Sequence, residues 1–168
     1  AELTDNKFIE ASFRQFLEQY RYHPAPYPTA ENYLSILEKI VPSEFHQLID
    51  DTFRHITRWD LRVISATVTP LTTGEWQTTV EIEARKYRSR DLGSEEEVEL
   101  NTPLFLSVSE RQNSTPGEET SMLIEPPSGR SIHQFTTLQK PKWATIDPDF
   151  LLPDPVLRDQ TMPVTTSE

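Results

Sequence analysis

The stretch PSEFHQLIDDTFRHITRWDLRV, residues 42–63, is where the hydrophobic pattern of this chain changes its period. Before it, apolar residues recur every three or four positions, which is typical of helices packed along one face. After it, apolar and polar residues alternate, which is typical of half-buried strands. The change predicts an α+β chain in which a short helical segment precedes a β-domain.

Three helices are predicted before the change of period. The first runs from about Asp5 to Tyr20, with Thr4 or Asp5 as its N-cap. Thr29 caps the second helix and Pro42 ends it, because proline has no N–H for the helix. The third has the cleanest periodicity. The expected buried faces are Ile9, Phe13, Phe16, Leu17 and Tyr20; Tyr33, Leu34, Leu37, Ile40 and Val41; and Phe45, Leu48, Ile49, Thr52, Phe53 and Ile56.

These helices bury little surface by themselves, so we expect them to pack on the β-domain and on a larger helical body. The connector at residues 22–29 has three prolines in five positions, which keeps it extended and stiff. It resembles a ligand of a proline-binding domain, but a rigid spacer between two helices is the preferred interpretation.

The first two strands show the alternation best. Leu61, Val63, Ser65 and Thr67 are expected to face the core, and the strand at residues 76–84 is expected to bury its even positions. Beyond Ala84 the even positions become Lys86, Arg88 and Arg90. A β-bulge at residues 84–86 would reconcile the two halves of this strand.

An exposed, charged hairpin is predicted next. Residues 91–94 read as a tight turn, and the acidic run EEEVE at residues 95–99 follows. In a four-residue hairpin the facing pairs are Arg90–Glu95, Arg88–Glu97, Lys86–Glu99 and, on the other face, Tyr87–Val98. A charge-balanced structural hairpin is preferred over a binding stripe for a charged partner.

Further short strands are expected around residues 104–108, 122–124, 132–138 and 143–152, with a polar loop at 112–119. The total of about seven strands, separated by regular turn signals, predicts an antiparallel Ig-like β-sandwich. The expected organisation is a helical segment at 1–58, a sandwich domain at 59–152, and an extended or disordered tail at 153–168.

Bulk composition excludes several classes of function. The formal net charge is −11 and no basic cluster occurs, so we expect no nucleic-acid partner. The chain has no cysteine, which excludes disulfides and thiolate-bound metals. No apolar run reaches the length of about 18 residues that spans a membrane, so no direct insertion is expected. The sequence starts without Met or a signal peptide, and we interpret it as a mature or excised fragment.

The titratable residues form no recognisable catalytic constellation. The four histidines are His23, His46, His55 and His133, and no two have the spacing of a helical zinc motif. A zinc site from His46, Asp50 and a distant ligand is conceivable, but a solvated helix face is the preferred interpretation. Asp50 and Asp51 point about 100° apart on a helix, which disfavours shared acid–base work. Asp50, Asp51 and His55 are therefore assigned to the solvated side of the third helix.

Two further patterns have structural explanations. Residues 147–149, Asp-Pro-Asp, lack the glycine and the terminal glutamate of a calcium loop, and a turn is preferred. Trp59, Trp76 and Trp143 are sugar-stacking candidates, but core positions on strands are preferred. No catalytic, cofactor-binding or metal-binding residue is assigned to this chain.

Six segments in order resemble the C-terminal part of bacterial membrane proteins that join an ABC-type permease to a membrane alanyl aminopeptidase domain of peptidase family M-one. The resemblance covers most of residues 8–152. Its segments are FLEQYRY at 16–22, PYPT at 26–29, LIDDTF at 48–53, ITRWD at 56–60, VEIEARKYR at 80–88 and KWATIDPDFLL at 142–152.

The resemblance implies that the parent removes N-terminal residues from peptides with a zinc held by a His-Glu-x-x-His motif and a further glutamate. Neither that motif nor the Gly-x-Met-Glu-Asn type stretch that binds the peptide amino end occurs in the 168 residues, so no role is transferred. The expected partners are the helical and peptidase domains of the parent and a protein partner. The expected location is a soluble compartment at the periplasmic face of the bacterial inner membrane.

The leading hypothesis is therefore a noncatalytic C-terminal accessory domain. The alternative is a free-standing β-sandwich module that recognises a protein or a carbohydrate, and a third hypothesis is an independent hydrolase. The orphan amphipathic helices favour the first, because a self-contained sandwich needs no such lead-in.

Overall fold

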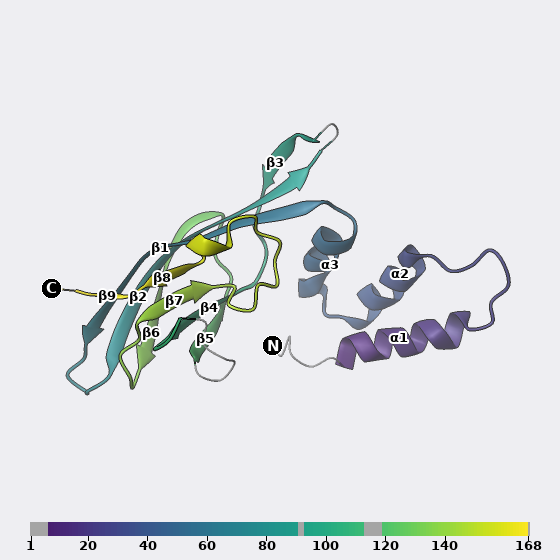
Figure 1. Ribbon diagram of the computed structural model, residues 1–168. Helices are drawn as coiled ribbons and strands as arrows, with labels where there is room; N and C mark the ends of the chain where they lie inside the picture. The colour runs from purple at the N-terminus through teal and green to yellow at the C-terminus, as the bar shows by residue number, and fades with distance from the viewer. Residues whose placement is uncertain (1–6, 91–92, 113–118, 168) are drawn as a thin grey trace. The chain divides into compact units, whose positions relative to one another are not determined.

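The computed structural model describes residues 7–90, 93–112 and 119–167 (Figure 1). Its contacts divide the chain into two compact units, Ala1–His55 and Ile56–Glu168. In the described residues three α-helices precede nine strands in two sheets, which makes the fold α+β as predicted. The two units are described in turn.

The first unit contains the three predicted helices: α1 (Lys7–Tyr20), α2 (Ala30–Ile40) and α3 (His46–Phe53), the last preceded by a 3-10 turn at Ser43–Phe45. Thr29 is the N-cap of α2, and its backbone N–H donates to Asn32 Oδ1 at 2.8 Å. Val41, just before Pro42, is already extended and ends the helix. The predicted caps Thr4 and Asp5 lie outside the described residues.

A small core joins these helices. Leu34 and Leu37 of α2 pack with Ile49 of α3, and Tyr33 and Val41 border them. Tyr33 also packs against α1: the ring of Phe13 stacks on the Tyr33 ring, with 4.8 Å between the ring centroids. Buried Ser12 completes the contact between α1 and α2, with its hydroxyl 3.0 Å from the Tyr33 hydroxyl.

Parts of the apolar helix faces are exposed. Phe53 and Ile56 are 59% and 78% exposed, and the α1 residues Ile9, Phe13 and Leu17 are 43%, 51% and 59% exposed. Periodicity shows which residues share a helix face, but other elements decide whether that face is covered.

The second unit, Ile56–Glu168, holds the two sheets. The five strands of the first are β1 (Thr57–Pro70), β2 (Trp76–Ser89), β3 (Glu95–Val98), β6 (Gly129–Thr137) and β9 (Thr165–Thr166). The four of the second are β4 (Leu104–Ser109), β5 (Glu119–Ile124), β7 (Trp143–Ile146) and β8 (Thr161–Pro163). A 3-10 turn, Leu157–Asp159, precedes β8.

The first sheet is mixed: β9 pairs parallel to β1, and all the other strand pairs of the sheet are antiparallel. The prediction of seven antiparallel strands therefore missed this parallel pair and undercounted the strands. The two additional strands are β8 and β9, within residues predicted as an extended or disordered tail. They pair with β7 and β1, so their formation depends on contacts distant in sequence.

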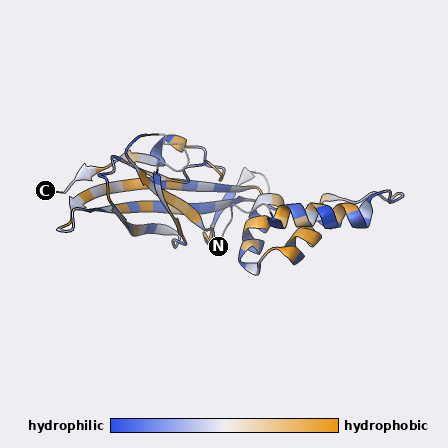
Figure 2. Cartoon of the chain, turned by 90° about the horizontal axis from the view of Figure 1, so that it is seen from below, coloured by the Kyte–Doolittle hydropathy of each residue, from blue (hydrophilic) through white to orange (hydrophobic). Residues whose placement is uncertain are grey.

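β1 and β2 form one long antiparallel hairpin, and Figure 2 shows apolar and polar residues alternating along it. The predicted even positions of β2 are confirmed as its inward row from Thr78 to Ala84, while Trp76 is half-buried. This row continues to Lys86, which is 1% exposed, so no bulge occurs at residues 84–86. The bulge lies in β1 between Val63 and Ser65.

The bulge also reverses the predicted inward positions at the end of β1. Beyond it the buried residues are Ala66 and Val68, whereas the prediction had Ser65 and Thr67 facing the core. An inserted residue shifts the alternation by one, and side chains after it move to the other face.

The charged hairpin has a different register from the predicted one. Lys86 is opposite Val98 and Tyr87 is opposite Glu97, one residue away from the predicted pairs. Arg90 forms an ion pair with Glu96 and not with Glu95. Lys86 belongs to the inward row and is 1% exposed, whereas the prediction had it on the exposed face of the hairpin. Two residues of the predicted turn, 91 and 92, and most of the polar loop at 112–119 lie outside the described part of the chain.

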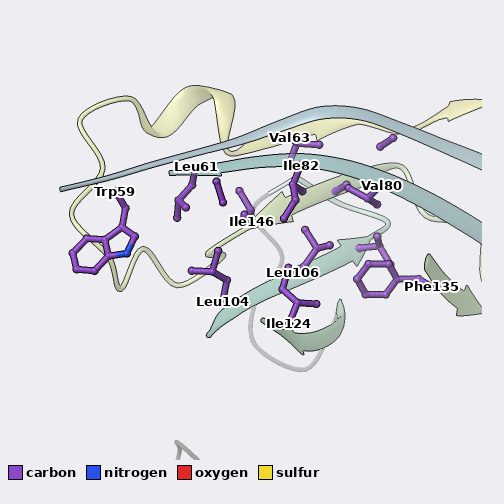
Figure 3. Packing of buried hydrophobic residues seen from close by; sticks show 14 of the residues in the cluster. Trp59, Leu61, Val63, Val80, Ile82, Leu104, Leu106, Ile124, Phe135 and Ile146 are labelled. Atoms are coloured by element: carbon purple, nitrogen blue, oxygen red, sulfur yellow. The ribbon is translucent and has the colours of Figure 1, made fainter. Parts of the chain in front are cut away.

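The main core fills the space between the two sheets (Figure 3). Leu61, Val63, Val80 and Ile82 come from the long hairpin and are at most 3% exposed. Residues of β4, β5, β6 and β7 meet them: Leu104, Leu106, Val108, Ile124, Phe135, Ala144 and Ile146. Full burial of a Leu or Ile side chain contributes about 1.5–3 kcal/mol, so this layer accounts for most of the stability of the unit.

Candidate functional site

The histidines do not assemble a metal centre in the described residues. His46 Nε2 lies 2.8 Å from the backbone oxygen of Glu38. Asp50 contacts His55 at 3.1 Å and Arg54 at 3.9 Å. Within residues 7–90, 93–112 and 119–167, no group of three or more His, Cys, Asp or Glu residues is arranged to hold a metal ion.

The Asp50–Asp51 pair is split between two environments. Asp50 has a side chain that is 32% exposed, in agreement with the expected solvated side. Asp51 is 1% exposed, so its assignment to the solvated side is wrong. Neighbours on a helix point in different directions, so in α3 the side chain of Asp51 is buried while that of Asp50 is partly exposed. This separation gives no shared acid–base geometry.

The tryptophans do not form an open stacking platform. Trp59 is 1% exposed, and its indole Nε1 donates to Thr102 Oγ1 at 3.3 Å, as expected of a core position. Trp76 is half-buried, and the Lys140 ammonium lies 5.1 Å from its ring centroid. Trp143 is half-buried on β7. These positions favour packing over sugar binding.

Asp147 organises a turn, as the sequence predicts for residues 147–149. Its two carboxylate oxygens accept the backbone N–H groups of Leu151 and Leu152 at 3.0 and 2.9 Å. The Asp147 backbone has φ of 50°, in the left-handed region, which aspartate tolerates better than most residues. Burial raises the pKa of this carboxyl, while the two backbone N–H groups act in the opposite direction.

Asp154 connects the C-terminal segment to the middle of β1. Its carboxylate accepts the backbone N–H groups of Leu61 and Val156, both at 2.8 Å, and the Gln160 amide Nε2 at 3.2 Å. Gln160 is fully buried, and its backbone oxygen accepts the Ile146 N–H. All these contacts are internal, so this cluster is structural.

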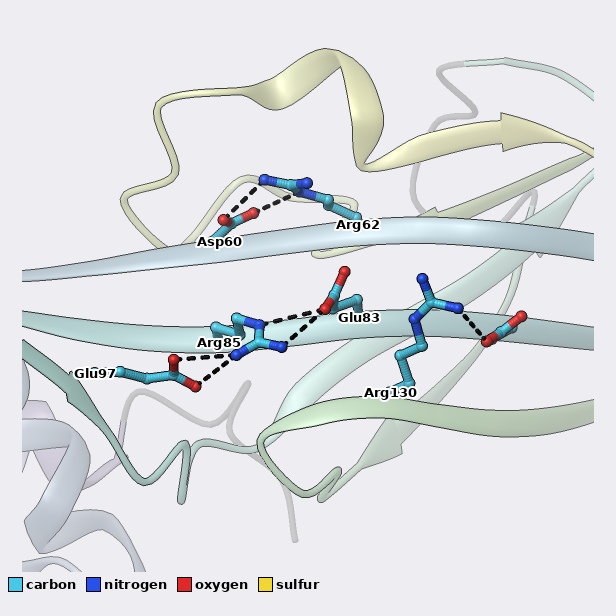
Figure 4. A network of polar contacts seen from close by, with 7 residues as sticks. Asp60, Arg62, Glu83, Arg85, Glu97 and Arg130 are labelled. Carbon is cyan, nitrogen blue, oxygen red and sulfur yellow. Dashed lines mark hydrogen bonds and ion pairs between the residues drawn. The ribbon is translucent and has the colours of Figure 1, made fainter.

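The outer face of the first sheet carries a network of ion pairs (Figure 4). Arg62 holds Asp60 through two hydrogen bonds of 2.8 and 2.9 Å. Arg85 lies between Glu83 and Glu97, with contacts of 3.1 and 2.9 Å. Arg130 reaches the carboxylate of Glu81 at 3.4 Å. Partly exposed pairs each contribute about 0–1 kcal/mol, so the network tunes surface charge more than stability.

The second unit has a hollow of about 390 Å³. It lies between the end of β6 and the strands β4 and β5. Its walls combine hydroxyl, amide and apolar groups with one carboxylate: Val108, Ser109, Glu110, Thr120, Thr136, Thr137, Leu138, Gln139 and Pro141. Such a mixture suits a neutral, partly polar side chain better than a charged group.

β6 borders this hollow and ends the first sheet. One side of the strand pairs with β2 from Trp76 to Ala84, and no other described strand pairs with it. The sequence analysis singled out no residue here, although one signal was available. Between Glu125 and Asp147 the chain has no carboxylate, whereas its basic residues there are Arg130, Lys140 and Lys142.

Comparison with known proteins gives no independent support for any family: no family model, curated protein or solved structure matches the chain. In the described residues no helix is both long and apolar enough to cross a membrane. The candidate binding surface is consequently defined by geometry alone, as the hollow and the neighbouring edge of β6.

Proposed function

We propose that this chain is a noncatalytic accessory region from the C-terminal part of a membrane-associated zinc aminopeptidase-like protein. In this proposal the second unit is an Ig-like sandwich that supports the peptidase at the periplasmic face of the membrane. The parent would use its zinc to release N-terminal residues from peptides. Support comes from the six resembling segments and from the apolar surface of α1.

The exposed α1 surface is the observation that carries the proposal. Ile9, Phe13 and Leu17 are spaced four residues apart, so they form one stripe along the helix. Each is more than 40% exposed. Burial of such side chains stabilises by about 25 cal/mol per Å² of apolar surface, which gives several kcal/mol for three residues. The occupant that we propose for this stripe is the remaining helical body of the parent.

Binding between the chain and the separately produced remainder of the parent tests this proposal. We expect a complex by analytical ultracentrifugation, and loss of that complex when Ile9, Phe13 and Leu17 are all changed to serine. The matched control is Tyr22→Ser, because Tyr22 is 95% exposed but lies outside the helix. A complex that survives the triple substitution contradicts the assignment of the stripe.

A second experiment tests the noncatalytic part of the proposal. The chain alone is incubated with zinc and an alanyl-arylamide substrate, and release of the arylamine is followed by absorbance. We expect no turnover above that of zinc in buffer. Turnover that scales with protein concentration would establish the third hypothesis, an independent hydrolase, and refute the accessory role.

The alternative function, a free-standing recognition module, is favoured by one different observation. The edge of β6 and the adjoining hollow offer a binding surface within the sandwich unit itself. The half-buried Trp76 and Trp143 disfavour a carbohydrate ligand, which needs an open aromatic face. A module of this kind would therefore recognise a protein.

A further inference from the structure

The edge of β6 differs from the other sheet edges of the sandwich. β3 has four residues, three of them glutamate, and β9 has two. β8 has three residues and includes Pro163, while β5 has six. Short length, charge and proline are the devices by which proteins prevent pairing at sheet edges. β6 has nine residues and no proline, so among the described strands that end a sheet it is the longest.

The side chains of β6 are those of a strand that a partner can cover. Phe135 is buried and anchors the strand, whereas Ile132 is 66% exposed and Leu138, just beyond the strand, is 81% exposed. Arg130 is the only charged side chain of the strand when histidine is neutral. An added strand would satisfy backbone groups of the free edge and would bury part of Ile132.

Charge selects the partner. The whole chain has 27 acidic and 16 basic residues, yet no acidic residue occurs from 126 to 146. The charged residues of this stretch are Arg130, whose guanidinium contacts Glu81 of β2 at 3.4 Å, and the two lysines Lys140 and Lys142. A second copy of this chain would bring a net charge of −11 with it, so self-association is opposed by repulsion between the two copies.

We propose that β6 binds an extended acidic segment of a protein partner by strand addition. Acidic side chains of the segment lie on the outer face of the sheet, where they share the Arg130 guanidinium with Glu81. The alternate side chains point the other way, and one of them enters the hollow at Thr136 and Thr137. Glu110 in the wall of the hollow disfavours an acidic side chain there and favours a neutral one. The inference stands on the sandwich unit alone and does not depend on the aminopeptidase proposal.

A synthetic probe tests the inference directly. The probe is a fluorescein-labelled peptide of about ten residues with alternating threonine and glutamate, a typical strand length. The matched control alternates threonine and lysine. We expect saturable binding of the glutamate peptide by fluorescence anisotropy and about tenfold weaker or undetectable binding of the lysine peptide. Equal binding of both peptides, or no binding of the glutamate peptide, overturns the proposal.

N-methylation of the probe distinguishes strand addition from simple charge attraction. Two versions of the glutamate peptide carry N-methyl groups on every second residue, on the threonines in one version and on the glutamates in the other. A strand presents alternate N–H groups to opposite edges, so one version is expected to bind like the parent peptide and the other to lose binding. Equal affinities for the two versions overturn strand addition.

Protein variants locate the site. Arg130→Glu is expected to weaken binding of the glutamate peptide about tenfold, because it places a like charge beside the probe. Arg90→Glu is the matched control, since Arg90 is equally exposed but follows the far end of β2. Circular dichroism checks that both variants are folded. Equal loss in both variants, or a concentration-dependent dimer that occupies β6 in the absence of peptide, contradicts the proposed occupant.

Discussion

Asp154→Ala is the substitution that tests most sharply how the C-terminal segment is held to the sandwich. The carboxylate of Asp154 accepts three hydrogen bonds, from the N–H groups of Leu61 and Val156 and from the Gln160 amide. Leu61 and Gln160 are both 0% exposed, so water cannot easily replace the lost acceptor for either. Val156 is partly exposed, so its N–H can donate to water instead.

The expected magnitude follows from these burials. Each buried donor left without an acceptor costs about 1–3 kcal/mol, so the two buried donors together predict a loss of about 2–6 kcal/mol. Asp154→Asn retains one acceptor oxygen and is expected to lose less, about 1–2 kcal/mol. Asp149→Ala removes an exposed aspartate from the same segment and is expected to change stability by less than about 0.5 kcal/mol.

Urea unfolding followed by tryptophan fluorescence measures these differences. Trp59 is a suitable reporter because it is 1% exposed and its backbone N–H donates to the Pro153 oxygen at 2.9 Å, next to the substituted residue. The reasoning is refuted if Asp154→Ala unfolds at the same urea concentration as Asp149→Ala. A loss equal in the Ala and Asn variants would refute the assignment to hydrogen bonds, because an asparagine oxygen in the place of Oδ2 keeps the bonds from Leu61 and Gln160.

Three further predictions concern pH and the core. Burial lowers the pKa of His133 below its usual 6.5, so the stability linked to its neutral form is present above that value and is lost as pH falls through the folded-state pKa. His133→Gln is expected to make the urea midpoint depend less on pH below 6.5. Burial raises the pKa of Asp147 above 3.8, so the stability linked to its protonated form is present below that value and is lost as pH rises through the folded-state pKa. Asp147→Asn is expected to remove this pH dependence of the free energy of unfolding, measured in acid titrations. Leu106→Ala opens a cavity at a side chain that is 0% exposed and is expected to lose about 3–5 kcal/mol in urea unfolding, and a loss under about 1 kcal/mol would show that the core collapses around it.

The sequence predicts the larger divisions of the fold because they depend on local patterns. The three helices, the Thr29 cap and the stop before Pro42 follow from helical periodicity and from backbone chemistry. The inward row of β2 from Thr78 to Ala84 follows from strict alternation. Residues close together in the chain determine each of these features, so no tertiary information is needed.

The sequence does not determine the exact register of the strands or the position of the bulge. The bulge lies between Val63 and Ser65, whereas the pattern around Lys86 predicts it in the next strand. The interpretation fails because it assumes that a lysine faces solvent, and in the structure Lys86 is 1% exposed. The predicted β2–β3 register is one residue off for another reason: it assumes a four-residue hairpin with Arg90 opposite Glu95, whereas Ser89 is opposite Glu95.

The candidate binding surface could be predicted only in part. The absence of carboxylates between Glu125 and Asp147 is visible in the sequence. That β6 pairs on one side alone, and that Thr120 and Thr136 border one hollow, depends on how distant strands are ordered. Periodicity assigns a side chain to a face, but it contains no information about which edge of a strand is occupied.

The sequence by itself therefore determined the α+β class, the order of the elements and most of their inward faces, because these arise from local backbone preferences and from the burial of apolar side chains. Tertiary structure alone decided the strand order, the parallel pairing of β9 with β1 and the burial of Asp51, Lys86 and Gln160. The physical reason is that pairing and burial depend on groups brought together from distant parts of the chain. The free edge of β6 is a result of that assembly.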